Sequence, residues 1–352
     1  MNIVRKLPRL CAAVLLITAL AMVGAGAIAQ TAAKFHVKQI WHIGGDGGWD
    51  YLKADPGAHR LYIARGNRVQ VVDTTNGKLI AEMGGMEGVH GVALDSSGKY
   101  GYVSDGKAGL IRVFDRATLK VIASVPAQKN PDAIIFDPAT KRVFAFNGRS
   151  DSATALDART NRVLQTIPLP GRPEFAQADG RGNVYVNLED KNQIERIDSK
   201  TLKTTATWPI APCDSPSGLA IDRAHHRLFS VCHNQLMIVL DTQTGRVIAT
   251  PAIGQGPDAA RYDARRRLAF SSNGRDGTLT VVREDSANSY TPVQTLTTRN
   301  GARTMALDSS TGTIYLVTAD FGPRPAATAA NPHQRPTILP GTFVVLVVGT
   351  DK

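Results

Sequence analysis

The sequence is poor in cysteine and in aromatic residues, and it has a single long apolar run. Three of its 352 residues are cysteine and 6% are aromatic. The cysteine spacing excludes a CxxCH haem site, a zinc ribbon and a CxxC redox motif. The GxSxG, HExxH and Walker sequences are also absent. These absences favour a binding protein, although they leave open whether the chain is an enzyme.

The apolar run lies at the N-terminus. Residues 10–25 are apolar, a basic head precedes them, and a small-x-small sequence follows at residues 27–29. This pattern is typical of a secretory signal peptide. We therefore expect residues 1–29 to be cleaved and residues 30–352 to form one exported domain, periplasmic or extracellular, without a transmembrane span. A retained N-terminal anchor is the alternative.

The rest of the chain repeats one unit. In the copy at residues 91–126, apolar runs at 92–94, 100–103, 110–114 and 119–125 are separated by turn residues, which predicts a meander of four β-strands. An aspartate that follows the first strand marks seven copies at intervals of 40 to 45 residues: Asp55, Asp95, Asp137, Asp179, Asp222, Asp263 and Asp308. In five copies a second aspartate ends the third strand, where its side chain is expected to fix the following turn: Asp73, Asp115, Asp157, Asp198 and Asp241.

Seven four-stranded units predict an all-β fold, a seven-bladed β-propeller of antiparallel sheets stacked around one axis. The last copy ends soon after its third strand, residues 342–348, and lacks a fourth. Residues 35–43 alternate like the outermost strand of the other copies. We expect them to complete the last blade and close the ring, which removes an open sheet edge.

Two cysteines remain after removal of the leader. Cys213 lies in the connection that enters the fifth copy, and Cys232 follows the second strand of that copy. Both positions fall at the same end of the blade, so an oxidising compartment favours a disulfide between them. Two free buried thiols are the alternative.

The residues that begin the innermost strands are expected to surround the mouth of the central channel. They are Asp50, His90, Asp132, Glu174, Ser217, Asp258 and Arg303. Converging carboxylates raise one another's pKa or recruit a hard cation such as Ca²⁺ or Mg²⁺, and Asp132, Glu174 and Asp258 are the predicted ligands. His90 suits a metal ligand or a base, and Arg303 suits an anion-binding group. A polar, water-filled mouth without a ligand is the alternative.

Loops on the same face add candidate residues to the rim. Trp49 is placed to stack on a sugar or a base, and His233 and His333 lie in variable loops. Packing is the alternative role for each. The opposite face is expected to be the more electropositive, which makes nucleic acid a possible partner there; its cations are Lys78, Lys99, Lys141, Arg142, Arg159, Arg181, Lys200, Arg223, Arg246 and Arg265–Arg267.

The second strands carry a recurring motif, as in residues 102–105 (YVSD), 144–147 (FAFN) and 185–188 (YVNL). With the surrounding repeat, these motifs resemble the YVTN family of β-propeller repeats, found in YncE-like exported proteins. The resemblance covers nearly all of the mature chain, although no copy reads YVTN and residues 315–318 (YLVT) come nearest. It implies a seven-bladed ring in the periplasm or at the cell surface, and it implies no single activity.

The sequence therefore favours a monomeric binding or scaffold module without catalytic machinery. Its net charge of +11 suits a protein, a polysaccharide or another anionic polymer as partner. One alternative is a divalent-metal-dependent hydrolase or lyase, similar to a lactonase, with its site at the channel mouth. Another is an accessory subunit of a periplasmic redox enzyme.

Overall fold

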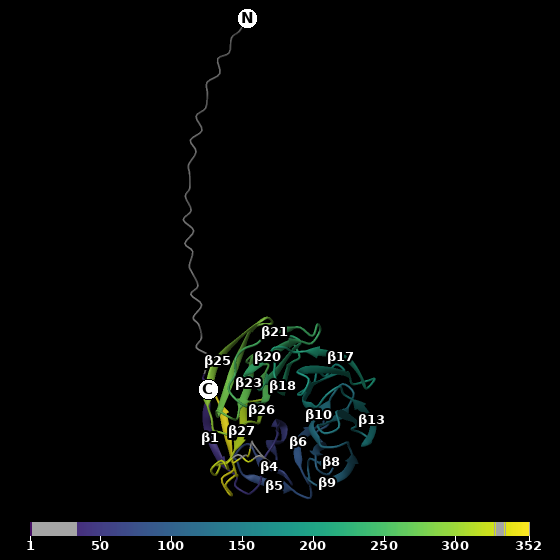
Figure 1. The fold of residues 1–352 in the computed structure, drawn as a ribbon, viewed down its shortest axis with the longest axis vertical. Helices are drawn as coiled ribbons and strands as arrows, with labels where there is room; N and C mark the ends of the chain where they lie inside the picture. The colour runs from purple at the N-terminus through teal and green to yellow at the C-terminus, as the bar shows by residue number, and fades with distance from the viewer. Residues whose placement is uncertain (2–33, 327, 329–333, 335, 352) are drawn as a thin grey trace. The chain divides into compact units, whose positions relative to one another are not determined.

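Seven four-stranded antiparallel sheets surround a central axis in the computed structural model (Figure 1). The structure describes residues 1, 34–326, 328, 334 and 336–351. The predicted signal peptide, apart from Met1, and His333 therefore lie outside the described residues. The prediction of a seven-bladed propeller is confirmed. In the described part of the chain, no helix is long and apolar enough to span a membrane.

The blades follow the chain, each running from an inner to an outer strand. The first contains β2 (Leu52–Asp55), β3 (Arg60–Ala64), β4 (Val69–Asp73) and β5 (Leu79–Met83), with the 3-10 turn η1 (Pro56–Ala58) after β2. The second contains β6 (Val89–Leu94), β7 (Tyr100–Asp105), β8 (Leu110–Asp115) and β9 (Val121–Pro126). The third contains β10 (Pro131–Asp137), β11 (Arg142–Asn147), β12 (Ser152–Asp157) and β13 (Arg162–Pro168).

The remaining blades repeat this order. The fourth contains β14 (Pro173–Ala178), β15 (Asn183–Leu188), β16 (Gln193–Asp198) and β17 (Lys203–Pro209). The fifth contains β18 (Pro216–Asp222), β19 (Arg227–Cys232), β20 (Leu236–Asp241) and β21 (Val247–Ala249). The sixth contains β22 (Pro257–Asp263), β23 (Leu268–Asn273), β24 (Thr278–Ser286) and β25 (Ser289–Thr297). The seventh contains β26 (Met305–Asp308), β27 (Thr313–Thr318), β28 (Val344–Gly349) and β1 (His36–His42).

Burial falls from the middle of each blade to its outer edge. Five of the six residues of β7 are buried, because the sheet is covered by a neighbouring blade on each side. The outer strand β9 buries only Val125 and exposes Val121 and Ile122. This strand was predicted from residue 119, but Leu119 has a φ of 59° in the preceding turn, so β9 begins two residues later.

The two ends of the described ring share one sheet, as predicted. β1 pairs antiparallel with β28, from His36 opposite Gly349 to His42 opposite Val344. Just before β1, Phe35 is 3% exposed and its ring stands edge-on to Phe270, with the centroids 5.3 Å apart. The chain therefore closes the ring by main-chain pairing and anchors the closing strand in the core.

The aspartates that end the third strands fix their turns as predicted. In Asp73 the Oδ1 atom accepts a hydrogen bond from the Thr75 backbone N–H at 2.8 Å. The same bond, to the backbone N–H two residues on, recurs at Asp115, Asp157, Asp198 and Asp241. The repeat thus encodes a local turn as well as a strand.

The predicted disulfide is present in the structure. The Cys213 and Cys232 sulfur atoms are 2.00 Å apart, and both residues are buried in the core of the fifth blade. A disulfide of this kind persists in oxidising compartments.

Candidate ligand-binding site

The residues at or just before the start of the inner strands converge at the channel mouth. His90 Nδ1 lies 2.7 Å from Asp50 Oδ2 and 3.7 Å from Asp132 Oδ1. The inner strands run side by side around the axis, so residues about 40 positions apart in the chain become neighbours. This sequence separation is the repeat length, which is why the repeat alone could place them together.

Arg303 joins the other half of the same ring. Its guanidinium pairs with Asp258, lies 3.5 Å from Asp50 Oδ1, and donates a hydrogen bond to the Trp49 carbonyl at 2.8 Å. Ser217 Oγ lies 2.9 Å from Asp258 Oδ1. Arg303 therefore links two carboxylates across the closure of the ring.

The environment of the channel mouth shifts the pKa values of the residues that surround it. Burial alone lowers the pKa of His90, but its hydrogen bond to Asp50 and the negative charge of Asp132 raise that pKa to about 9. Burial raises the pKa of Asp132 to about 7, against the opposing effect of His90. Burial, Asp132 and the neighbouring Glu189 raise the pKa of Glu174 well above its usual range. At neutral pH the His90 imidazole is thus a cation held by Asp50.

The candidate metal ligands group differently from the prediction. The sequence suggested Asp132, Glu174 and Asp258, whereas the ligand atoms that lie within 4.8 Å of one another belong to Asp50, His90 and Asp132. Arg303 occupies the Asp258 carboxylate instead. An imidazole nitrogen in the group fits a transition ion better than Ca²⁺ or Mg²⁺, which prefer oxygen ligands.

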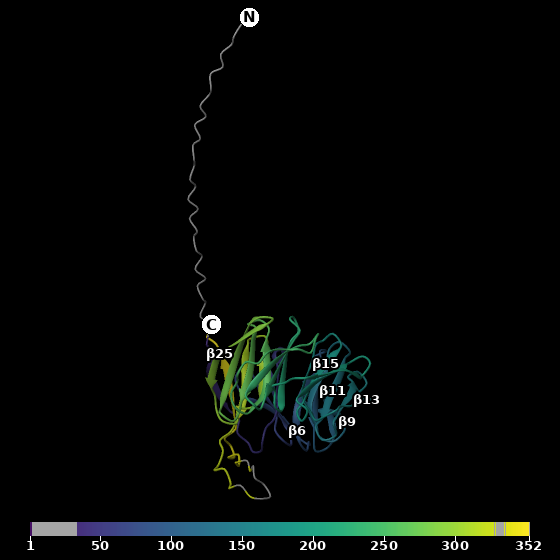
Figure 2. The ribbon, with the colours of Figure 1, turned by 45° about the horizontal axis from the view of Figure 1, so that its top comes forward.

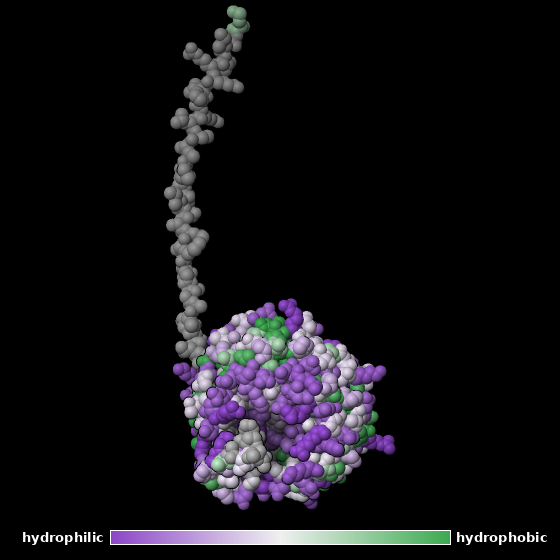
Figure 3. Space-filling view, viewed as in Figure 1, coloured by the Kyte–Doolittle hydropathy of each residue, from purple (hydrophilic) through white to green (hydrophobic). Residues whose placement is uncertain are grey.

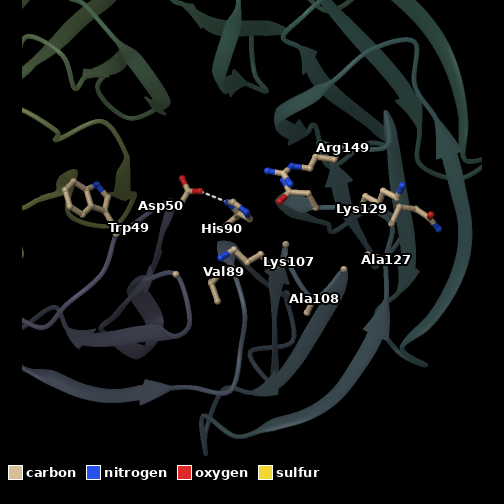
Figure 4. A pocket seen from close by; sticks show the side chains of 16 residues that line it. Trp49, Asp50, Val89, His90, Lys107, Ala108, Ala127, Lys129 and Arg149 are labelled. Carbon is tan, nitrogen blue, oxygen red and sulfur yellow. Dashed lines mark hydrogen bonds and ion pairs between the residues drawn. The ribbon is translucent and has the colours of Figure 1, made fainter. Parts of the chain in front are cut away.

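A pocket of about 830 Å³ opens beside this network and spans the first three blades. Asp50 and His90 line it together with three cations that the sequence interpretation did not single out: Lys107, Lys129 and Arg149 (Figure 4). All three are exposed, and in the described part of the chain none has a side-chain hydrogen bond or ion pair. They lie in the short connections after β7, after β9 and after β11, where the repeat pattern does mark loops of this face.

Two predicted rim residues lie outside the pocket's basic wall. Trp49 borders the pocket, but it is 9% exposed and its ring packs against Phe321 and Phe343, with centroids 6.0 and 5.6 Å away. It therefore serves as a core residue beneath the connection between β27 and β28, whose described residues 319–326 and 336–343 extend away from the sheets in Figure 2. His233 is exposed in the turn between β19 and β20 and does not line this pocket.

The channel inside the mouth carries cations rather than acids. A cavity of about 300 Å³ is lined by Lys53, Arg223 and Arg261 among apolar residues. Enclosure within the ring and the positive charges of Arg261 and Arg223 lower the pKa of Lys53 to about 8, although this side chain is open to the water of the cavity. Lys53 follows Tyr51 by two residues, so both side chains point to the same side of their strand. Along the axis, the acidic residues of the channel mouth are thus followed by the basic residues that line the cavity.

Several cations predicted to make the opposite face basic are used within the fold. Arg223 donates two hydrogen bonds to the Ala178 carbonyl, at 3.1 and 2.7 Å, and Arg266 pairs with Asp263 at 2.8 Å. Arg142 donates to the carbonyls of residues 199 and 200. These guanidinium groups are thereby less available to a polyanion. Figure 3 shows the other face, which carries the channel mouth; it is mainly hydrophilic and is hollowed near the middle of the ring.

Comparison with known proteins supports the fold and does not indicate a function. No family model matches the chain. No curated protein matches it. Among solved structures, it is similar to "Kuenenia stuttgartiensis Hydrazine Synthase", with a TM-score of 0.70 and 14% identity over 78% of this chain and 94% of the other. It is also similar to "Structure of U3-55K", with a TM-score of 0.73 and 10% identity over 90% of this chain and 98% of the other. A third is "Crystal structure of RRP9 WD40 repeats", with a TM-score of 0.73 and 9% identity over 90% and 97%. At these identities the chain shares a propeller fold with them, and function does not follow from the fold.

Proposed function

We propose that this propeller is an exported binding module that takes an anionic ligand in the 830 Å³ pocket at its channel mouth. The observation that carries the proposal is the unpaired basic wall formed by Lys107, Lys129 and Arg149. Unpaired cations around a concave surface attract carboxylate or phosphate groups and pair with them through charge-assisted hydrogen bonds.

Other cations near the loops of this face are already paired. Arg172 lies 2.7 Å from Glu189, Lys191 lies 3.3 Å from Asp190, and Arg299 lies 2.5 Å from Asp320. In contrast, the three pocket cations come from two neighbouring blades and face one hollow. Their spare hydrogen-bond donors are thus concentrated where a ligand can be enclosed.

The lining of the pocket favours an acidic, non-aromatic ligand. Apart from His90, the only ring among the described lining residues is that of Trp49, and this ring is buried in the core. Single-stranded nucleic acid is usually held by exposed aromatic rings on which bases stack. An acidic oligosaccharide needs no such platform, and the hydroxyls of a sugar suit the polar mouth beside the cations. We therefore favour a uronate-type glycan over nucleic acid.

Binding of a short, fluorescently labelled oligogalacturonate tests this proposal. We expect replacement of Lys107 and Arg149 by Ala to weaken binding about tenfold or more, which corresponds to roughly 1.4 kcal/mol. The matched control is the Lys78→Ala and Lys120→Ala pair, which removes the same charge from hairpin turns of the opposite face; it should change the affinity less than about twofold.

Two results would contradict the pocket. One is the absence of oligogalacturonate binding to the wild-type protein, and the other is an equal loss in the two double variants. An oligothymidylate of the same charge serves as the competing ligand. If it binds more tightly, and if only the Lys78 and Lys120 changes weaken it, then the opposite face binds nucleic acid and our assignment is wrong.

Export and membership of the YVTN, YncE-like family belong to the same proposal. The apolar N-terminal run and the Cys213–Cys232 disulfide support export. The motif-bearing second strands support the family. Expression of the full chain in a bacterium, followed by fractionation and intact-mass measurement, tests the leader. A periplasmic product that begins at Gln30 is expected, and an uncleaved membrane-bound product would support the retained anchor.

A second candidate is a metal-dependent hydrolase or lyase at the same mouth. It is favoured by the grouping of Asp50, His90 and Asp132 ligand atoms within 4.8 Å. A bound divalent ion would polarise a carbonyl oxygen or activate water, but it has to displace the proton that His90 shares with Asp50. Turnover of lactone or ester substrates that is lost with chelator and in Asp132→Asn would establish this activity. Oligogalacturonate binding without turnover would favour the binding module.

A further inference from the structure

A second cluster of ionisable groups lies on the opposite face, where the fifth and sixth blades meet. Asp222 ends β18, and His225 lies in the turn that follows it. Glu284 lies near the end of β24, and Tyr262 is in β22 of the sixth blade. His225 and His226 are adjacent in the sequence, a spacing that indicates no metal site by itself. The fold adds two carboxylates from elsewhere in the chain.

The ligand atoms of this cluster converge on one point. His225 Nδ1 lies 2.6 Å from Asp222 Oδ2 and 3.0 Å from Glu284 Oε1. The Tyr262 hydroxyl lies 3.3 Å from Asp222 Oδ2 and donates a short hydrogen bond to Glu284 Oε2. Burial and the two carboxylates raise the pKa of Tyr262, so its hydroxyl stays protonated beside them.

This junction differs from equivalent junctions of the ring. At several junctions, the residue one position beyond that of the third-strand aspartate donates its backbone N–H to the carbonyl that precedes the second strand; Arg116, Ser199 and Glu284 all do so. The Arg116 side chain pairs with Asp55 of the preceding blade at 2.5 Å, and the Ser199 hydroxyl donates to Asp137 of the preceding blade at 2.6 Å.

At the fifth junction the equivalent partner of the aspartate is itself an acid. Glu284 faces Asp222, and both are nearly excluded from water, each 2% exposed. Two buried carboxylates side by side repel each other unless a cation or a proton compensates them. At the Arg116 and Ser199 junctions this place supplies a hydrogen-bond donor to the facing aspartate, whereas here it supplies a second acid.

One oxygen of the cluster lacks a hydrogen bond. Glu284 Oε1 is buried and accepts none within the described residues, although His225 and Arg267 approach it at 3.0 and 3.5 Å. A buried carboxylate oxygen without a hydrogen bond is costly. It points toward the same space as His225 Nδ1 and Asp222 Oδ2. This space is open on one side, because the His225 side chain is 41% exposed.

We propose that Asp222, His225 and Glu284 bind a divalent first-row transition ion such as Zn²⁺. One imidazole nitrogen and two carboxylate oxygens form a ligand set that suits such an ion, and the open side leaves a position for water. Zinc bonds of about 2.0 to 2.2 Å at tetrahedral angles place ligand atoms roughly 3.3 Å apart. His225 Nδ1 lies 2.6 and 3.0 Å from the two carboxylate oxygens, so a movement of the exposed ring by less than about 1 Å brings these two distances to that spacing. The ion replaces the compensating proton, and Tyr262 orients both carboxylates by hydrogen bonds.

The proposal is tested by titrating tag-free, chelator-treated protein with zinc chloride in a calorimeter. We expect one strong site per chain at this cluster. His225→Ala should weaken it at least tenfold, whereas His226→Ala, a change of the neighbouring histidine in the same turn, should leave it unchanged. The His90→Gln variant reports any ion bound at the channel mouth and should not remove the strong site.

The Glu284→Gln variant distinguishes metal binding from a role of Glu284 in packing alone. The variant relieves the repulsion between the two acids, so without metal it should melt at the same or a higher temperature than the wild type. It should nevertheless lose most of the rise in melting temperature that zinc gives to the wild type. Absence of a strong zinc site in the wild type, or equal zinc binding in the His225→Ala and His226→Ala variants, would overturn the proposal.

Discussion

The ion pair between His90 and Asp50 makes the stability of the ring depend on pH. The pKa of His90 is raised from its usual 6.5 to about 9. A raised histidine pKa gives stabilisation that is fully present below pH 6.5 and is lost as the pH rises through 9. Since one pKa unit corresponds to about 1.4 kcal/mol, the pair should contribute about 2 to 3 kcal/mol at pH 7 and close to nothing at pH 9.5.

The assay compares the wild type with His90→Gln by urea unfolding at pH 7 and pH 9.5, with chelator present. Lys53 also titrates within this range, since its pKa is lowered to about 8, and its contribution cancels when the two proteins are subtracted. Burial raises the pKa of Asp132 to about 7, so the cost of ionising this carboxyl in the folded protein accumulates mainly below pH 7 and is largely complete at both pH values of the assay. The difference between the two proteins should therefore shrink by about 2 to 3 kcal/mol between the two pH values.

A difference that is the same at both pH values would refute the reasoning, because the histidine would then be uncharged in the folded protein at neutral pH. The Asp50→Asn variant provides an independent check by NMR. Removal of the carboxylate should move the midpoint of the His90 imidazole titration down toward its usual value. An unchanged midpoint would show that Asp50 does not hold the proton.

Three further changes probe the ring itself. Phe35→Ala empties a buried site beside the closing strand, so it should lower the free energy of unfolding by about 3 to 5 kcal/mol in urea titrations; a loss below about 1 kcal/mol would mean that the closing strand is not anchored there. Replacing Cys213 and Cys232 by Ser opens a link between residues 19 positions apart, which should cost about 3 kcal/mol. The same loss should appear on reduction of the wild type and not of the variant. Gly218→Ala would place a methyl carbon 2.6 Å from the Ala259 backbone of the next blade, and it should cost about 1 to 3 kcal/mol by overpacking; an unchanged unfolding midpoint would show that the two inner strands can separate.

The repeat made much of the fold predictable. The spacing of the aspartates defines where each unit begins, and the missing fourth strand of the last copy leaves residues 35–43 as its complement. The convergence of Asp50, His90 and Asp132 also follows from the repeat, because equivalent positions of neighbouring units must lie around one axis.

Side-chain partners were less predictable because they depend on contacts between blades. Trp49 seemed free to bind a ligand, but Phe321 and Phe343, which are 272 and 294 positions further along the chain, pack against it. The basic residues Lys107 and Arg149 lie in loops assigned to the correct face. What distinguishes them is that they line one pocket without an acidic partner among the described residues, and such a clustering cannot be seen in the repeat.

Where the fifth and sixth blades meet, the repeat contained a feature that the sequence interpretation did not recognise. Glu284 lies one residue beyond the position at which five other copies have an aspartate. The change in residue and register was visible, but its meaning depends on the side chain of Asp222 across the interface. Comparison of equivalent positions in adjacent copies could have revealed two acids in register.

The pairing of β1 with β28 means that the ring can close only after β28 has been synthesised. A ribosome releases β1 long before its partner β28, because the strands of six blades and of β26 and β27 lie between them in the chain. Until β28 is made, β1 has no partner and β27 has no outer neighbour, so an unfinished chain presents bare strand edges to which other chains can add. Interrupted synthesis or loss of the last few residues should therefore give aggregates rather than a slightly smaller ring.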